Sequence, residues 1–436
     1  MGDPHGRPGM YFTGFVCVKC GAAYPPDRDL LLCPACDNLL EAEYDYARLA
    51  RELDRDGLWR RPPTVWRWVE LLPVRDPSQI VTLGEGGTPL LRSERLARLC
   101  GVRELWIKSD ATGNPTGSLK DRSITVSATK AREFGYSVLS CDSTGNKASS
   151  AAAYAARAGL RSVVFCPHET PLPKLVQAVF FGAELIRVKG HYSEINAMYR
   201  RLIRSGRVKW YDCGTDNPFR YEGKKTYAYE IAQELGWKVP DRVLHPAAGG
   251  MSLVKTWKGF NELERLGWVD RVPRMTAVQA QDCAPIVEAW ARGDREVTGI
   301  EKRPTVASAL GVADPGLLGN RALEMIGASG GAAVGVTDEE TLLATRRLAQ
   351  EGLFVEPSGA VTIAGLPKLV ASGRVDRDES VVCVVTGSGF KDFERIAPMV
   401  RIPERVISGY EEMLAVAATM PGGARDEPCG GRAPVA

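Results

Sequence analysis

The sequence of 436 residues lacks an excess of charge of either sign and contains no long apolar run. Lysine and arginine total 56 and aspartate and glutamate total 53, so the net charge of +3 gives no electrostatic reason to expect binding to nucleic acid or a membrane surface. No stretch of about 18 apolar residues occurs, which argues against a membrane-spanning helix. The N-terminal MGDPHGRPGM lacks the apolar core of a secretory signal, and we therefore expect a cytoplasmic protein.

Dominant disorder and a disulfide framework are also excluded. Hydrophobic residues make up 44% and charged residues 25% of the chain, which is ordinary for a folded globular protein. The 11 cysteines are an odd number and most are scattered singly, which favours free thiols in a reducing compartment. At roughly 100–200 residues per domain, the length predicts two or three domains.

The N-terminal segment 11–48 carries two pairs of closely spaced cysteines. Cys17 and Cys20 form one CxxC turn, Cys33 and Cys36 form another, and 12 residues separate the two turns. Two such turns place four thiolates in the arrangement that a tetrahedral zinc ion prefers, and four cysteines leave no position open for a substrate. The sequence therefore predicts a structural zinc ribbon; the alternative is a redox or core role for the thiols.

Two further segments flank the main body of the chain. Residues 49–80 form a polar, proline-punctuated connector, whose Trp59, Trp66 and Trp68 we expect to pack against that body. Residues 401–436 are predicted to form a C-terminal helix and a flexible tail, because the last stretch is rich in glycine and proline.

Residues 81–400 alternate short strand-like runs with longer helical patterns, which predicts an α/β fold with mainly parallel sheets. The expected strands are 104–108, 138–141, 162–166, 184–188, 208–212, 242–245, 275–278, 332–336 and 381–385. The expected helices are 120–134, 146–159, 221–235, 251–266, 338–351 and 358–371.

Three loops that follow predicted strands have unusual sequences, and ligands of open α/β sheets bind at the carboxyl ends of strands. The loop 109–122 delivers Lys120 to the start of a helix, where the helix dipole favours its neutral, nucleophilic amine; alone, it would be read as a solvated lysine. The loop 143–150 offers hydroxyls, an amide and backbone N–H groups to a carboxylate or phosphate, or simply caps its helix. The loop 246–252 contains a Gly-Gly turn suited to a phosphate, although it is not the GxGxxG dinucleotide motif.

Together these loops resemble those of fold-type II pyridoxal-phosphate enzymes. NPTGSLKDR (114–122) resembles the motif of the cofactor-binding lysine, and STGNKASSAAAYAARAG (143–159) resembles the substrate-carboxylate loop. Their order and spacing are similar to those of the threonine synthase branch, as are GEGGTPL (84–90), NPFRYEGKKT (217–226), WKGF (257–260), EGLFVEPSG (351–359) and TGSGFKD (386–392). The resemblance implies a tryptophan synthase β-like fold with two open parallel sheets, in which a small subdomain of about 125–225 is inserted into the larger one.

The resemblance also implies roles for individual residues. Lys120 binds pyridoxal phosphate covalently and moves protons, while an arginine fork at Arg220 grips the leaving phosphate of O-phosphohomoserine. The implied cofactor contacts are Asn146 at the pyridine 3′-oxygen, Thr386 at the pyridine nitrogen, and the backbone of Ala247, Ala248, Gly249, Gly250 and Met251 at the phosphate. The implied substrate contacts are Ser143, Thr144, Gly145, Lys147, Asn217 and Arg220. A homodimer acting on a small amino acid is implied as well.

Two departures from the family pattern keep the substrate open. Lys147 stands where the family usually has threonine, and Gly214 stands where it has an asparagine that contacts phosphate. Lys147 either supplies a compensating charge to an anionic substrate or marks a different substrate, with a surface helix lysine as the third alternative. The leading expectation is threonine synthase. The alternatives are a cysteate synthase-like or other β/γ-replacement enzyme, including one with a phosphonate substrate, a threonine or serine ammonia-lyase, and a zinc-ribbon adaptor without catalysis.

Overall fold

The computed structural model describes residues 11–143, 145–170, 172–190, 192–401 and 406–420. The chain divides into two units, Met1–Ile396 and Ala397–Ala436. The first contains three sheets, and the described part of the second contains a 3-10 turn (Ala397–Met399) and one α-helix, α15 (Tyr410–Ala418). Within the described ranges, no helix combines the length and the apolarity needed to cross a lipid bilayer.

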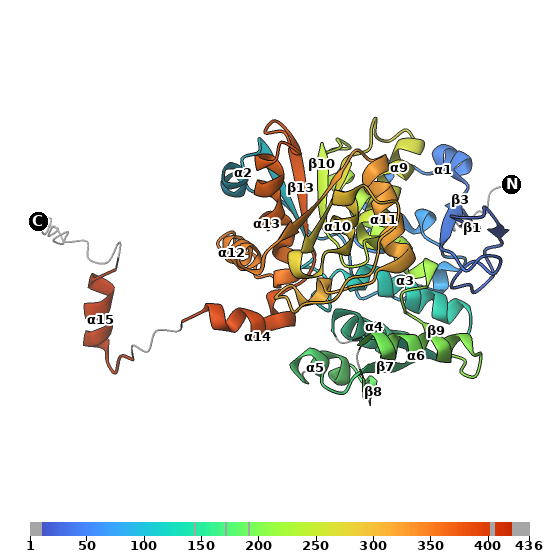
Figure 1. Ribbon diagram of the computed structural model, residues 1–436, viewed down its shortest axis with the longest axis horizontal. Coiled ribbons are helices and arrows are strands. Elements are labelled where there is room, and N and C mark those ends of the chain that lie inside the picture. Colours follow the sequence, from blue (N-terminus) through green and yellow to red (C-terminus); the bar gives the residue numbers. More distant parts are fainter. Residues whose placement is uncertain (1–10, 144, 171, 191, 402–405, 421–436) are drawn as a thin grey trace, which may run out of the picture. The chain divides into compact units, whose positions relative to one another are not determined.

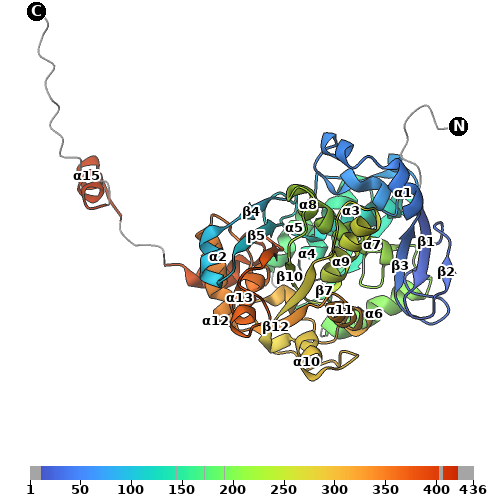
Figure 2. The same cartoon turned by 90° about the horizontal axis from the view of Figure 1, so that it is seen from above.

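A small antiparallel sheet opens the first unit, in the order β2 (Ala23–Tyr24), β1 (Phe12–Cys17), β3 (Leu40–Tyr44), and α1 (Tyr46–Glu52) follows it (Figure 2). Gly14 interrupts the register between β1 and β3 with a backbone φ of 132°. A side chain there would meet the carbonyl oxygen of Tyr24 at 2.1 Å, so only glycine allows the strands this close.

The larger of the other two sheets has six strands in the order β12-β11-β10-β13-β5-β4. Five strands are parallel, and β4 (Leu90–Arg92) pairs antiparallel with β5 (Glu104–Ser109) at one edge. The remaining strands are β10 (Arg242–Pro246), β11 (Arg274–Ala280), β12 (Ala332–Val336) and β13 (Ser380–Val385). The central β13 reads SVVCVV and is buried along almost its whole length, because helices cover both faces of a parallel sheet.

The third sheet has four parallel strands in the order β8-β7-β6-β9, built from β6 (Val138–Asp142), β7 (Arg161–Pro167), β8 (Glu184–Val188) and β9 (Tyr211–Asp212). Figure 1 shows its helices α4 (Asn146–Ala158), α5 (Leu172–Phe180) and α6 (Tyr192–Arg204) gathered around it. The alanine run of α4 is fully buried, since small side chains let the helix approach both the sheet and α3 (Lys120–Glu133) closely.

The helices of the six-stranded sheet are α8 (Thr226–Glu234), α9 (Met251–Arg265), α10 (Pro285–Arg292), α11 (Gly316–Ala328), α12 (Asp338–Ala349), α13 (Pro357–Ala371) and α2 (Glu94–Cys100). The chain of this unit ends in the short α14 (Phe393–Ile396). The α/β architecture with open, mainly parallel sheets confirms the predicted fold class. The antiparallel edge strand β4 was not predicted.

Two predicted elements differ from the structure. The helix expected at 221–235 is broken into α7 (Pro218–Glu222), a 3-10 turn (Gly223–Lys225) and α8. A side chain at Gly223 would meet the carbonyl oxygen of Arg122 at 1.7 Å, so α3 presses on the backbone at the break. The strand expected at 208–212 is reduced to Tyr211–Asp212.

The connector packs on the first unit through only part of its aromatic set. Trp68 is fully buried, and the ring nitrogen of the buried Trp66 donates to Thr125 Oγ1 of α3 at 2.8 Å. Trp59 is 53% exposed, so the expectation that all three tryptophans pack inward was wrong for this residue. Its ring instead lies 5.6 Å from the guanidinium carbon of Arg67.

Candidate active site

Lys120 is the first residue of α3, and the loop before it is fastened to the end of β13. The backbone N–H of Leu119 donates to the Thr386 carbonyl at 2.9 Å, and Ser118 forms a β-bridge with Gly387. These contacts place the side chain of Lys120 beside the carboxyl end of the central strand, where ligands of open parallel sheets bind.

The environment of Lys120 favours its neutral amine. Burial, then the charge of Arg220, lowers the pKa of Lys120 to about 8, while Glu356 acts in the opposite direction. Across the described ranges, no acceptor lies within hydrogen-bond distance of Lys120 Nζ. A lysine with this pKa is partly neutral near pH 8, so it is a competent nucleophile and proton carrier.

Asn146 and Glu356 connect the two parallel sheets at this site. Asn146 begins α4, and its side-chain amide donates to the carboxylate oxygens of Glu356 at 3.1 and 3.2 Å. Glu356 precedes α13 and is 4% exposed, and burial raises the pKa of its carboxyl group. The starts of α3, α4 and α13 therefore lie around one point, where their backbone dipoles favour a bound anion.

Arg220 is held by the short helix α7. The Asn217 side chain accepts from the Arg220 backbone N–H at 3.2 Å and donates to the Asp212 carbonyl at 2.7 Å, so Asn217 fixes the turn that carries the arginine. Arg220 is 5% exposed, so it is a buried arginine and not a surface one. Its Nη1 donates to the Gly214 carbonyl at 2.6 Å, and its Nε is buried without a partner. The guanidinium thus retains donors for a ligand.

The two departures from the family pattern belong to one cluster of charges. Lys147 is 8% exposed, and its ammonium donates to Asp142 at 2.8 Å, which excludes the surface alternative and holds the pKa of Asp142 below its usual range against the effect of burial. A side chain at Gly214 would meet the Asp212 carboxylate oxygens at 2.5 and 2.7 Å. Asp212 therefore takes the space that an asparagine at position 214 would need.

The Gly-Gly loop follows β10 and opens α9. Gly250 has φ of 84°, and a side chain there would meet Ala322 Cβ at 2.4 Å. Gln279 orients the loop by donating to the carbonyls of Ala247 and Ala248 at 3.1 and 3.4 Å. The Met251 side chain is buried in the core, so this residue offers a ligand only its backbone. The first N–H groups of α9 have no partner within the helix and suit a phosphate.

The other predicted contacts lie at the same edge. Ser143 is 7% exposed and its hydroxyl accepts from the Gly145 N–H at 3.3 Å. Thr386 is 3% exposed, next to the lysine loop through its carbonyl. Thr144 lies outside the described residues.

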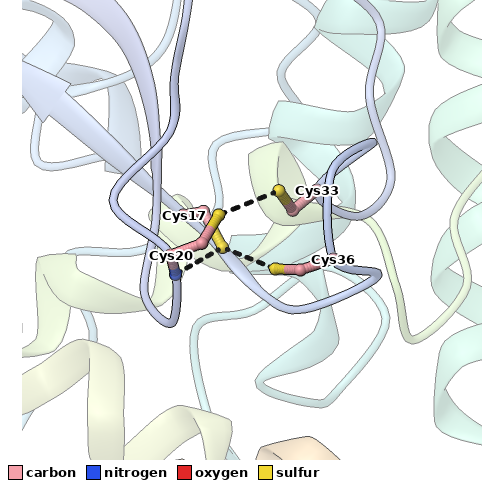
Figure 3. Close-up of side chains that lie close together, drawn as sticks. All are labelled: Cys17, Cys20, Cys33 and Cys36. Atoms are coloured by element: carbon pink, nitrogen blue, oxygen red, sulfur yellow. Dashed lines mark hydrogen bonds between the residues drawn. The ribbon is translucent and has the colours of Figure 1, made fainter.

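The four predicted metal ligands are brought together in the ribbon. Figure 3 shows the side chains of Cys17, Cys20, Cys33 and Cys36 pointing toward one another. All four sulfurs lie within 4.8 Å of one another, and the Cys17–Cys36 and Cys20–Cys33 sulfurs are 3.4 and 3.6 Å apart. A disulfide needs about 2.05 Å, whereas a tetrahedron with zinc–sulfur bonds of about 2.3 Å has sulfurs about 3.8 Å apart. The donor set therefore suits a tetrahedral metal ion.

Residues near the site that were not singled out from the sequence include Gln279, Glu356 and Lys224, whose pKa is lowered by burial and by the charges of Lys120 and Arg220. The glutamate lies in the EPSG motif, which carried a family resemblance but no individual role. Lys224 lies in NPFRYEGKKT beside Lys225, and the sequence gives no sign that the two lysines have different surroundings. No local pattern marks the glutamine, because its role depends on a loop from another part of the chain.

The site has the features that pyridoxal phosphate requires. It has a partly neutral lysine amine, a glycine loop at a helix start for a phosphate, and unpaired buried donors on Arg220. Asn146 binds Glu356, whose charge acts on Lys120, and the Thr386 carbonyl accepts from the N–H of Leu119, next to the lysine. The residues present therefore fit the group.

Comparisons with known proteins agree with this geometry. The family described as "Pyridoxal-phosphate dependent enzyme" matches residues 81–387. The chain is 42% identical to the threonine synthase of Methanocaldococcus jannaschii and 40% identical to that of Methanosarcina acetivorans, over 93% of this chain and 96% of each relative. It is 37% identical to the threonine synthase of Mycobacterium tuberculosis, over 76% of this chain and 89% of the relative.

Solved structures share the fold at lower identity. An L-serine ammonia-lyase from Rhizomucor miehei superposes with a TM-score of 0.61 at 19% identity, over 71% of this chain and 96% of that one. Threonine deaminase isoform 2 from Solanum lycopersicum gives 0.60 at 18% identity, over 78% and 96%. With the family match and the sequence relatives together, the chain belongs to the pyridoxal-phosphate dependent enzymes and, among them, to the threonine synthase family.

Proposed function

We propose that this protein converts O-phosphohomoserine and water to threonine and phosphate, as a pyridoxal-phosphate dependent threonine synthase. The observation that carries the proposal is the placement of a lysine of lowered pKa, Lys120, beside the buried Arg220. Lys120 provides the amine that pyridoxal phosphate needs, and Arg220 is suited to a phosphate on the substrate. The similarity to threonine synthases over 93% of the chain supports the same reaction.

Pyridoxal phosphate bound at this site supplies an electron sink for negative charge at the substrate α-carbon. Lys120 Nζ holds the cofactor, then removes and returns protons at the substrate carbon atoms. The bond between Cγ and the phosphate oxygen breaks and phosphate leaves with the bonding electrons. The water oxygen then bonds to Cβ, which yields threonine.

The remaining residues bind and orient. Asn146 and Thr386 would contact the ring of the bound cofactor, and the backbone of Ala247, Ala248, Gly249, Gly250 and Met251 would bind its phosphate. Ser143, Gly145 and the start of α4 receive the amino-acid carboxylate, where the helix dipole favours a negative charge. Arg220 binds the leaving phosphate, and Asn217 positions Arg220 through the backbone hydrogen bond at 3.2 Å.

The ribbon binds a structural zinc ion through Cys17, Cys20, Cys33 and Cys36. The tight sulfur cluster and the all-cysteine donor set support this assignment. Metal analysis of the purified protein should find about one zinc per chain, bound independently of the cofactor. We also propose a cytoplasmic homodimer, and light scattering of the purified protein measures the oligomeric state.

The function is tested with purified, cofactor-loaded protein and O-phosphohomoserine. Equal release of inorganic phosphate and threonine is the expected result. Ammonia release from L-serine or L-threonine at a higher kcat/KM would assign the site to an ammonia-lyase. If the cofactor-loaded protein consumes none of the three compounds, the assignment of the cofactor site stands and the assignment of the substrate is wrong.

A further inference from the structure

Lys224 and Lys225 are consecutive residues of one 3-10 turn, and their surroundings are opposite. Lys225 is fully buried and its ammonium lies 2.8 Å from both Glu222 and Glu262. Lys224 is 5% exposed, and no carboxylate or other acceptor lies within hydrogen-bond distance of its ammonium across the residues that the structure describes. The structure therefore satisfies one buried cation completely and leaves its neighbour without a counter-charge.

Lys224 lies against the Tyr221 ring, which it shares with Arg220. Its Nζ is 5.3 Å from the centre of the Tyr221 ring, and the guanidinium carbon of Arg220 is 4.9 Å from the centre of that ring. Burial, Lys120 and Arg220 together hold the pKa of Lys224 well below its usual range. Lys120, Arg220 and Lys224 are thus three basic groups of which two disfavour the protonated form of the third, Lys224.

Lys224 also lies within electrostatic reach of the Gly-Gly loop. Burial, followed by the charge of Lys224, lowers the pKa of His245 to about 3. His245 is the penultimate residue of the strand β10, which ends just before the Gly-Gly loop. The charge of Lys224 therefore acts on the end of the strand that leads into the Gly-Gly loop.

Burying a cation without a counter-charge is costly, and binding an anion removes that cost. Arg220, which contacts the same Tyr221 ring, has a buried Nε without a partner. Lys224 and Arg220 can therefore offer an anion one ammonium group and one edge of a guanidinium group. Lys147 differs from these two side chains, because its ammonium already forms an ion pair with Asp142.

We propose that Lys224 binds a phosphate group of a small molecule held in the active site, in concert with Arg220. This inference rests on the proposed function for the identity of the molecule, because both the substrate and the cofactor of that reaction carry a phosphate. A bound phosphate favours the protonated form of Lys224, which then supplies an additional positive charge to that phosphate.

The test compares Lys224→Gln and Lys224→Met, which remove the charge, with Lys224→Arg, which retains it. Lys209→Gln, at an exposed position, is the matched control for loss of one lysine charge. Three quantities are measured on cofactor-loaded protein: the rise in unfolding temperature with inorganic phosphate, the KM for O-phosphohomoserine, and the rate of cofactor loss on dialysis. Circular dichroism confirms that each variant folds.

We expect both neutral variants to weaken phosphate binding by about tenfold to a hundredfold, the range for a hydrogen bond to a charged group. Lys224→Arg should recover most of the affinity, and Lys209→Gln should match the wild type. The ligand-free neutral variants should be at least as stable as the wild type, because they relieve repulsion among cations. A purely structural lysine would instead lower the stability of the ligand-free protein.

The pattern of effects identifies the phosphate. A weaker response to inorganic phosphate and a higher KM, with unchanged cofactor retention, assigns Lys224 to the substrate. Faster cofactor loss, with an unchanged response to inorganic phosphate, assigns it to the cofactor phosphate. No change in any of the three quantities overturns the proposal. Because inorganic phosphate is itself a probe, the first measurement is informative even if the wild-type protein does not consume O-phosphohomoserine.

Discussion

Asn146 donates its side-chain amide to the buried carboxylate of Glu356, 210 residues later in the chain, at 3.1 and 3.2 Å. The hydrogen bonds join the first residue of α4, on the four-stranded sheet, to the residue before α13, on the six-stranded sheet. The same carboxylate raises the pKa of Lys120, against burial and Arg220, which lower it. Glu356 therefore acts on the lysine and on the cofactor contact together, which makes it a positioning residue.

Glu356→Gln keeps an acceptor for Asn146 and removes the negative charge. The pKa of Lys120 should then fall below about 8, because one charge that favours the protonated amine is lost. Cofactor attachment to the apo-protein needs the neutral amine, so its rate rises with pH, and the midpoint of that rise should move to lower pH. The pH dependence of the attachment rate, followed by absorbance, measures the shift; an unmoved midpoint would contradict it.

Lys120→Ala should abolish turnover, with kcat reduced at least about a thousandfold, because the cofactor-holding amine and the principal proton carrier are one group. Borohydride reduction of the loaded wild-type protein should fix cofactor on the peptide containing Lys120, and the variant should show none there. Lys209→Ala is a control at an exposed position. Full activity in Lys120→Ala would remove the proposed mechanism.

Arg220→Ala should raise the KM for O-phosphohomoserine by about tenfold to a hundredfold, because a charge-assisted contact with phosphate is lost. It should also raise the pKa of Lys120 and move the midpoint of cofactor attachment to higher pH, opposite to Glu356→Gln. Steady-state kinetics and the attachment assay measure the two effects separately. If kcat/KM is unchanged, the phosphate contact is misassigned.

Lys147→Met should destabilise the protein by about 3–5 kcal/mol, since Asp142 is left buried without its partner. Adding Asp142→Asn to this variant should restore much of the loss, because both charges are then absent. Urea unfolding of the two single variants and the double variant gives the coupling energy. A lysine whose main role is substrate binding would instead raise KM and leave the free energy of unfolding unchanged.

Removal of the metal should loosen the contact between the ribbon and the catalytic helices. Glu41 of β3 ion-pairs with Lys258 of α9 at 2.6 Å, and Tyr44 donates to Glu222 of α7 at 2.9 Å. Because α7 carries Arg220 and α9 begins at the Gly-Gly loop, the ribbon contacts both segments that we propose to bind phosphate.

Chelation, or Cys20→Ser, should therefore lower the unfolding temperature and raise the KM for O-phosphohomoserine, with a smaller effect on kcat. The four-cysteine cluster predicts that added zinc restores chelated wild-type protein but not the serine variant. A ribbon that melts separately, with KM unchanged, would show that it does not support the site.

Local sequence patterns by themselves determined most of the strands and several of the helices, whereas the roles of the site residues came from the resemblance to a known family. Strand runs such as 332–336 and helix starts such as Lys120 follow from apolar periodicity, turn residues and capping, which depend on neighbours in the chain. The two CxxC turns predicted the sulfur cluster for the same reason.

Only the tertiary structure decided how buried charges are paired. The sequence shows two adjacent lysines at 224 and 225, yet one meets two carboxylates and the other meets cations. It shows Lys147 beside Asn146, yet the lysine is neutralised by Asp142 while the asparagine binds a glutamate 210 residues away. It predicts one helix at 221–235, which α3 breaks at Gly223. The free energy of a buried charge or a close backbone approach depends on which distant groups share its volume, and local propensity carries no information about them.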